Sequence, residues 1–351
     1  MKYSKFSSLQ ILLSLFLTKF YINHLIIAPF FYELYSKTAI IILSIIYLVQ
    51  PFELIFINKL FNKEYKPFKT NNLFLFFYNV IFSTLILLSL VYLLDLYIYN
   101  VSNIYLIILG LLIPLLFINK YSNINIFRLT PLFSIFIFIM MIFLFFSLKD
   151  FSIYTIYPNT KIKNIPLLII LTLNIVLPYV LFPSLKGLSS NNFKLSNTII
   201  LSIIFSIFNI LITIRDGLSL GILINSKAFP FYESLRFSSI TAFSLPIDIL
   251  YIIFIIFYSF YVLSILNNNL YISLNINNSL IKNILTIIPF IFLIILINNI
   301  SLFNIIKYDL LAISTFSLIY ILISNIISYS RRSKWINILI TIKKFLRIIS
   351  K

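Results

Sequence analysis

The first long apolar segment, which decides the fold, covers residues 9–31 and reads LQILLSLFLTKFYINHLIIAPFF. Its apolar residues form a nearly continuous run, and a membrane-spanning helix needs roughly 20 such residues. A strand of a membrane β-barrel would instead alternate between apolar and polar residues. The segment therefore predicts a helix that crosses a bilayer.

Further apolar runs follow along the chain, each bounded by charged residues, asparagine clusters or prolines. Together with the first, they predict spans near residues 8–32, 38–57, 73–94, 101–119, 130–148, 166–183, 197–224, 243–266, 284–302 and 309–328. Of the 351 residues, 61% are hydrophobic and only 10% are charged, too few charges to cover a water-soluble domain. We expect an all-α integral membrane protein with about ten transmembrane helices in a single transmembrane domain, residues 1–328.

Basic residues predict how the chain is oriented. It carries 27 lysines and arginines against 9 acidic residues, a formal net charge of +18. Most of the basic residues lie at the N-terminus, in loops after even-numbered spans and in the tail, so the positive-inside rule places both termini in the cytoplasm. The charge is therefore attributed to topology and membrane lipids, and no nucleic-acid partner is expected.

The C-terminal tail, residues 329–351, has the pattern of a membrane-surface helix. Trp335, Ile338, Ile342 and Phe345 recur at three- and four-residue steps, with lysines and arginines on the other face. We expect a basic amphipathic helix that lies on the cytoplasmic side against lipid phosphates.

The composition also excludes several kinds of chemistry. The chain has no cysteine and a single histidine, His24, which excludes disulfides, thiolate sites and two-histidine metal motifs. No pair of acidic residues has the spacing of a hydrolase or glycosyl-transfer site. We expect no enzyme, and therefore no catalytic residue, metal or cofactor.

Polar and helix-breaking residues within the first span mark a candidate site. Lys19, Asn23, His24 and Pro29 lie within one apolar stretch, where such residues are costly. One interpretation is a discontinuous helix that lines a cavity and exposes backbone groups to a ligand. The other is a kink near the outer interface, with His24 satisfied by a neighbouring helix.

The sixth span contains a similar disturbance, since Asn174, Pro178, Tyr179 and Pro183 interrupt its apolar run. If ten helices divide into repeats 1–150 and 160–328, spans one and six occupy corresponding positions. Paired breaks of this kind indicate the ligand site of an inverted-repeat transporter, with half-helix N-termini facing an anionic group. Tyr78 and Tyr258 from neighbouring spans could close such a pocket.

Acidic residues give no ion-coupling site from sequence alone. Asp216 and Glu233 are among those near predicted outer ends or outer loops, and Asp248 lies near the start of a span. None is placed clearly at the middle of a bilayer, so no proton or sodium relay is predicted.

The segment before the eighth span resembles a known family. Pro230 lies beside aromatic residues, Arg236 follows with Glu233 three residues before it, and an Ile247-Asp248 pair opens the next span. The start Ser7-Ser8-Leu9-Gln10 is also similar to the Ser-x-x-Gln start of the same family. On these motifs the chain resembles the spore germination permeases, the B subunits of nutrient germinant receptors.

The resemblance implies the fold of the amino acid–polyamine–organocation transporters, with two inverted five-helix repeats. It implies the bacterial cell membrane, specifically the inner membrane of the spore, and partner A and C receptor subunits. The ligand would be a small nutrient such as an amino acid, bound near Asn23, His24, Pro29 and their counterparts in the sixth span. Pro230, Glu233, Arg236 and Asp248 would then belong to an outer gate or a partner-contact element.

The chain departs from this family in its glycines. It has four in all, and none before Gly110, whereas family members usually carry glycines in the first helix. A break without glycine is less permissive, which favours nutrient sensing over nutrient passage.

Three functions follow from these patterns. The leading one is a germinant-receptor subunit that binds a nutrient, changes conformation and triggers germination. The second is a secondary transporter for amino acids. The third is a polysaccharide polymerase or flippase, although the short outer loops do not favour it. Gene neighbours encoding a lipoprotein and a larger spore-membrane subunit would separate the first from the third.

Overall fold

The computed structural model of the chain describes residues 7–61, 71–99, 103–118, 128–146, 195–237, 247–274, 276 and 278–299. These residues form helices joined by turns, with no strand among them, which confirms the predicted helical class. Five of the helices are long and apolar enough to cross a membrane: Ser8–Tyr35, Phe76–Tyr97, Ser196–Leu220, Ile249–Asn268 and Ser279–Asn298. Their length and composition indicate insertion into a membrane.

Most of the predicted spans can be compared with helices. The sixth and tenth spans and the tail, residues 329–351, lie outside the described residues, as do Asn174, Pro178 and Tyr179. Each of the other spans falls on a helix. The eighth continues further than predicted, to Ser273 at the end of α12 (Ile247–Ser273). The ninth begins earlier, at Ser279 of α13 (Ser279–Asn299), where Asn278 Oδ1 accepts a hydrogen bond from the Leu280 amide and caps the helix.

The N-terminal helix lies at the centre of the structure. It comprises α1 (Ser8–Ile22), a π-helical turn η1 (Asn23–Ile27) and α2 (Ala28–Tyr35). Within its most apolar window 94% of the residues are buried, against 28% for Ser279–Asn298. This explains why the segment is apolar on every face: it contacts protein all round.

The Ser-x-x-Gln start forms a capping box. Ser7 Oγ accepts a hydrogen bond from the Gln10 amide at 3.2 Å, and Gln10 Oε1 accepts one from the Ser7 amide at 3.3 Å. These bonds satisfy backbone donors at the start of α1. Local helix capping therefore accounts for this motif without any family-specific role.

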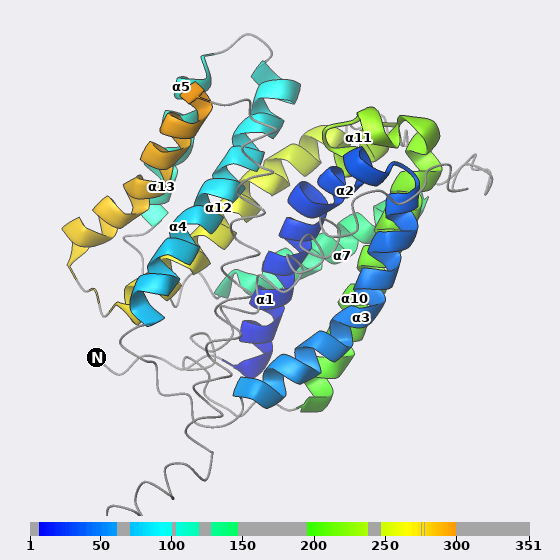
Figure 1. Ribbon diagram of the computed structural model, residues 1–351, viewed down its shortest axis with the longest axis horizontal. Coiled ribbons are helices and arrows are strands. Elements are labelled where there is room, and N and C mark those ends of the chain that lie inside the picture. Colours follow the sequence, from blue (N-terminus) through cyan, green and yellow to red (C-terminus); the bar gives the residue numbers. More distant parts are fainter. Residues whose placement is uncertain are drawn as a thin grey trace, which may run out of the picture.

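Helices α3 (Thr38–Phe61) and α10 (Leu195–Leu220) run side by side along one flank of the structure (Figure 1). Only Ser36 and Lys37 separate α2 from α3, and Ser36 has a positive φ of 50° at this turn. On α10 a polar stripe is buried, comprising Thr198, Ser202, Ser206, Asn209, Thr213 and Asp216. In a membrane protein, polar side chains are expected to face other helices in this way.

The other flank is formed by α5 (Ile104–Ile118) and α13, packed on α4 (Asn71–Leu94) and α12 (Ile247–Ser273). A second π-helical turn, η2 (Asp95–Tyr99), extends α4. Helix α7 (Thr130–Phe146) packs on α1 and also contacts α12, where Phe136 and Phe254 stack with ring centroids 4.3 Å apart.

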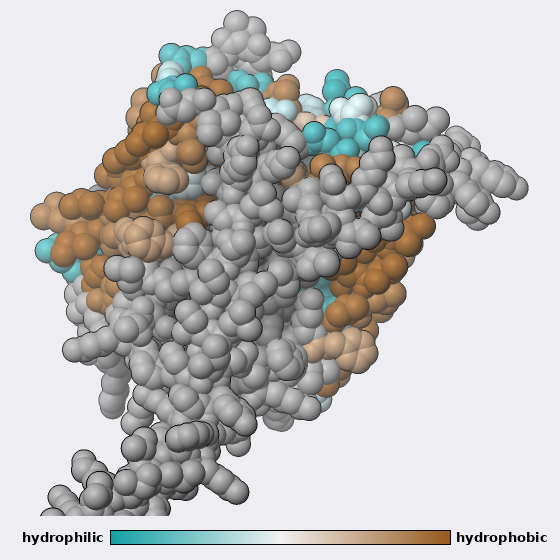
Figure 2. Space-filling view, viewed as in Figure 1, coloured by the Kyte–Doolittle hydropathy of each residue, from teal (hydrophilic) through white to brown (hydrophobic). Residues whose placement is uncertain are grey.

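Both flanks of the structure expose apolar side chains. Figure 2 shows hydrophobic atoms on the α5–α13 flank and the α3–α10 flank, with hydrophilic atoms gathered at one end. On α3 and α10 the exposed residues include Ile41, Ile45, Leu48, Phe52, Ile200, Ile203 and Ile207. The apolar faces are those that lipid would contact, since they would be unfavourable in water.

Gly217 allows α10 to approach α3 closely. A Cβ atom at this position would overlap with Cδ1 of Ile40 and lie 3.2 Å from its Cγ1. Gly217→Ala is therefore expected to lower the free energy of unfolding by about 1–3 kcal/mol, measured by unfolding the purified chain in detergent. Adding Ile40→Val, which removes Cδ1, should recover part of the loss.

Gly110 provides the matched control on α5. A Cβ atom there would meet nothing within 4 Å, so Gly110→Ala should leave stability unchanged or raise it slightly. Equal losses from both alanine substitutions would show that the contact between Gly217 and Ile40 is not tight.

Candidate functional site

Two of the polar residues of the first span, Asn23 and His24, lie in a π-helical turn. The Ala28 amide donates to the carbonyl oxygen of Asn23, five residues earlier. Pro29 explains this geometry, because a proline ring in an α-helix clashes with the carbonyl group four residues before it, here that of Leu25. One extra residue in the turn relieves the clash while the chain stays helical on both sides.

The form of this disturbance decides between the two interpretations of the first span. Asn23, Ile27 and Ala28 all keep right-handed helical dihedral angles. The helix is therefore bulged and not unwound, and no half-helix N-terminus faces a ligand at this point. Of the two interpretations, the structure agrees with a disturbed but continuous helix, although Pro29 does line a cavity.

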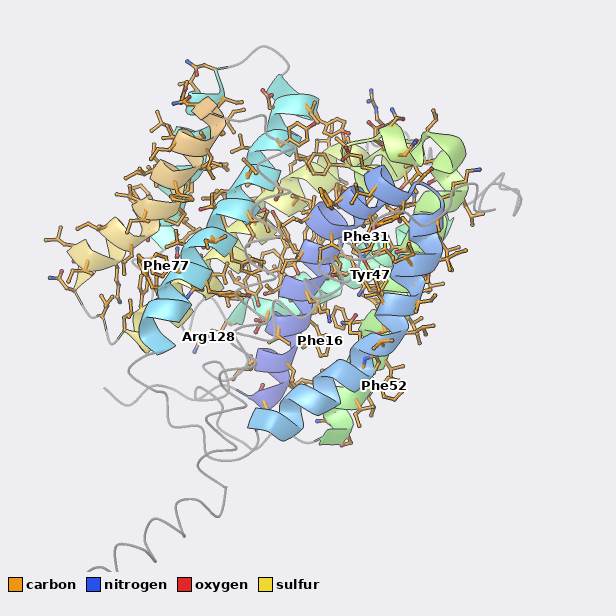
Figure 3. All side chains as sticks on the ribbon, viewed as in Figure 1. Phe16, Phe31, Tyr47, Phe52, Phe77 and Arg128 are labelled. Atoms are coloured by element: carbon orange, nitrogen blue, oxygen red, sulfur yellow. The ribbon has the colours of Figure 1, made fainter. Side chains whose placement is uncertain are left out.

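His24 is buried within the bundle by residues from three other helices. Its Nε2 atom donates to Asn209 Oδ1 of α10 at 2.8 Å. Its ring centroid lies 5.4 Å from that of Phe231 and 6.5 Å from that of Tyr47. In Figure 3 Tyr47 lies on the side of α3 near the central helix, and Phe52 lies toward the outer side. His24 thus joins the central helix to α10.

A cavity of about 260 Å³ opens above this turn. One wall comes from the central helix, and the other from the segment that joins α10 to helix α11 (Pro230–Phe237) through the 3₁₀ turn η5 (Gly221–Ser226). The lining residues are Leu25, Ile26, Pro29, Phe30, Glu33, Tyr92, Asn225, Ser226, Lys227, Ala228 and Phe229. Segments about 200 residues apart in sequence therefore build one cavity at one end of the bundle.

Opposite charges line this cavity. Glu33 comes from α2 and Lys227 from the loop before α11. The Lys227 Nζ atom lies 3.8 Å from Glu233 Oε1, which also accepts a hydrogen bond from the Tyr97 hydroxyl at 3.0 Å. The cavity thus presents an acidic and a basic side chain beside apolar walls formed by residues such as Pro29 and Phe30.

Aromatic rings pack helix α11 and the residue before it, Phe229, against neighbouring helices. Tyr232 packs on Tyr97 with ring centroids 4.2 Å apart, and Phe231 packs on Tyr251 of α12 at 5.1 Å. Phe229 contacts Tyr92 of α4 at 5.6 Å. Helix α11 therefore bridges the central helix, η2 and α12, and is called the cap.

The predicted gating residues divide between the two sides of this cap. Pro230 is the first residue of α11, a position that the fixed φ of proline favours. Its side chain is buried. Glu233 points inward with 6% of its surface exposed, whereas Arg236 is exposed. On the inner side, Glu233 contacts Lys227 and Tyr97. Asp248 is the second residue of α12.

The two predicted tyrosines lie away from the cavity. Tyr78 is buried on α4, 5.5 Å from the ring of Phe82. Tyr258 packs against Tyr21 at 5.4 Å and Phe133 at 5.5 Å. Neither lines the cavity, where Tyr92 lies instead. With 23 tyrosines in the chain, sequence could not distinguish packing residues from lining residues.

Sequence reasoning missed a buried charged pair. Arg215 and Asp216 are 4% and 1% exposed, respectively, and lie near the end of α10. Arg215 Nη1 donates to Ser234 Oγ at 2.9 Å, and Nη2 donates to the Ser234 carbonyl at 3.0 Å. Ser234 Oγ in turn lies 2.8 Å from Asp216 Oδ1, to which it donates. The available signal was two adjacent charges inside a predicted span.

Comparison of the chain with protein-family models and with curated proteins finds no match.

Proposed function

We propose that the chain is a permease-like subunit of a spore germinant receptor that binds a small nutrient, in the first instance an amino acid. The cavity between the central helix and the segment Asn225–Phe229, which precedes α11, is the binding site in this proposal. Nutrient binding would alter the position of α11 and so signal to the partner A and C subunits. The membrane would be the bacterial cell membrane, specifically the inner membrane of the spore, with both termini cytoplasmic.

The observation that supports this proposal is the charge arrangement of the cavity. An amino acid carries an ammonium and a carboxylate group on one carbon atom. Glu33 would attract the ammonium group and Lys227 the carboxylate, while apolar residues such as Phe30 and Phe229 would contact the side chain. The volume of about 260 Å³ lies below the roughly 300–1,000 Å³ of pockets for drug-sized ligands, in keeping with a small solute.

The germinant-receptor role itself rests on the resemblance around Pro230, Arg236 and Asp248. The cavity agrees with it to this extent: Asn225 to Phe229, in the same segment, form one of its walls. A sensor needs only a difference in nutrient affinity between two conformations. The bulged but continuous first helix fits such a sensor, because it leaves no unwound passage through this helix.

Deletion of the gene tests the proposed role. Spores without it are expected to lose germination with at least one single amino acid, scored for each of the twenty amino acids separately. Spores that receive the intact gene again should recover the response, which controls for effects on neighbouring genes. Normal germination of the deletion strain with every nutrient would rule out the receptor function.

A secondary amino-acid transporter is the second candidate, and the burial of Asp216 favours it. An ionisable residue inside a membrane-spanning segment is a common feature of ion-coupled transport. The transporter predicts concentrative uptake of a radiolabelled amino acid into proteoliposomes under a proton or sodium gradient. Binding without uptake under either gradient would favour the receptor.

A further inference from the structure

Ser234 joins α11 to both charged residues of α10. Consecutive residues on a helix point about 100° apart, so one neighbouring residue rarely contacts both. Here the hydroxyl and carbonyl groups of Ser234 accept from Arg215, while the same hydroxyl group donates to Asp216. Ser234 of the cap thus accepts both hydrogen bonds from the Arg215 guanidinium group and donates one to the Asp216 carboxylate.

The strength of this connection depends on the charge of Asp216. A hydrogen bond to an ionised carboxylate is roughly twice as strong as one between neutral groups. The Ser234 hydroxyl also has an alternative acceptor, the Phe231 carbonyl of its own helix, at 2.9 Å. Protonation of Asp216 would therefore remove the charge that holds the hydroxyl group across the interface and leave it bonded within α11.

Protonation would also change the balance around Arg215. With Asp216 neutral, the buried guanidinium group loses its nearest negative charge, and a buried uncompensated charge is strongly unfavourable. Movement of α11 away from α10 would replace the two hydrogen bonds from Arg215 to Ser234 with bonds to water, and so hydrate the guanidinium group. Both effects act in the same direction, toward a lifted cap.

The surroundings of Asp216 identify it as the group that titrates. Besides Arg215 on its own helix, the ionisable groups that interact with it electrostatically are Tyr32 of α2, Tyr47 of α3 and Tyr251 of α12. Glu233 of α11 instead contacts Tyr97 and Lys227. The Oδ2 atom of Asp216 is buried and has no hydrogen-bond partner among the described residues, so it is the atom that can take up a proton.

We infer that Asp216 is a proton-binding switch: its ionised form holds α11 against α10 through Ser234, and its protonated form releases α11 from α10. The step is a simple protonation, in which a proton from water adds to Oδ2 and no other covalent bond changes. The inference rests on the proposed function only for its consequence, that acidity would alter nutrient capture.

The latch can be tested without nutrient, because the chain has no cysteine of its own. Leu235→Cys, at a position 2% exposed on α11, reports lifting of the cap, and Ser226→Cys, at an exposed position, is the reference. The full-length protein in detergent is labelled with a water-soluble maleimide from mildly acidic to mildly alkaline pH. The labelling rate of Leu235→Cys is divided by the rate of Ser226→Cys, to correct for the effect of pH on thiol ionisation. This ratio is expected to rise about tenfold toward acidic pH.

Variants of the latch complete the test. Asp216→Asn cannot ionise and should give the high ratio at every pH, whereas Asp216→Glu should keep the pH dependence. Ser234→Ala removes the bridging hydroxyl group and should also give a high, pH-independent ratio, so it decides the question if Asp216→Asn does not fold. Two results would overturn the inference: a ratio that is constant with pH when Asp216 and Ser234 are both unchanged, or a low ratio in Ser234→Ala. Failure of amino-acid binding would leave it intact and count only against the proposed function.

Discussion

Arg215→Ala is expected to lower the free energy of unfolding by about 3–5 kcal/mol at neutral pH. The substitution removes both hydrogen bonds to Ser234 and leaves Asp216 as a buried charge without its basic neighbour. The loss should shrink at acidic pH, where the carboxyl group can take up a proton and become neutral. Thermal and denaturant unfolding of the purified chain in detergent would measure both effects.

Lys227→Ala is the matched control, since it removes a basic side chain that is 30% exposed and lies 3.8 Å from Glu233. Ion pairs in contact with water contribute only about 0–1 kcal/mol. The double variant Arg215→Met with Asp216→Leu should recover much of the stability, because apolar residues can replace a buried charged pair. A loss in Arg215→Ala no larger than that in Lys227→Ala would contradict the burial of this pair.

Ala228→Trp is expected to raise the nutrient concentration for half-maximal germination at least about 100-fold. Ala228 lines the cavity, and an indole ring there would fill much of its volume of about 260 Å³. The nutrient would be the amino acid to which spores with the unmodified gene respond, measured as the germination rate over a concentration series. Stability should change little, because the ring enters open space.

Leu223→Trp is the control in the same loop, at a position that is 54% exposed and does not line the cavity. It should leave the nutrient response within about threefold of the original, since surface substitutions usually have small effects. An unchanged response in Ala228→Trp, with the variant present in the membrane at normal amounts, would show that the nutrient binds elsewhere.

The helical fold could be predicted from sequence because a lipid bilayer restricts the choice so strongly. Backbone groups in hydrocarbon must be satisfied within the segment, so a long apolar run such as residues 9–31 becomes a helix. The disturbance at Pro29 was also predicted, and the capping box of Ser7 and Gln10, which was not predicted, likewise depends on residues within one or two turns. Interactions between residues close in the sequence determine these features.

The site was only partly predictable. His24 and Pro29 were identified correctly as unusual, and the segment around Pro230 does meet the first helix at one cavity. Tyr78 and Tyr258 lie away from this cavity, and Asp216, near the end of α10, is buried against α11. Each of these depends on which helices lie next to one another, and a run of apolar residues carries little information about its neighbours.

The amino-acid sequence by itself determined that the chain forms apolar helices, where most of them lie and where the first of them is disturbed. Only the tertiary structure decided that this disturbance is a π turn, that His24 bonds to Asn209 across 185 residues and that Ser234 bridges Arg215 and Asp216. The reason is physical: helix formation is satisfied by hydrogen bonds within a few residues, whereas a buried polar side chain is satisfied by whichever helix packs against it.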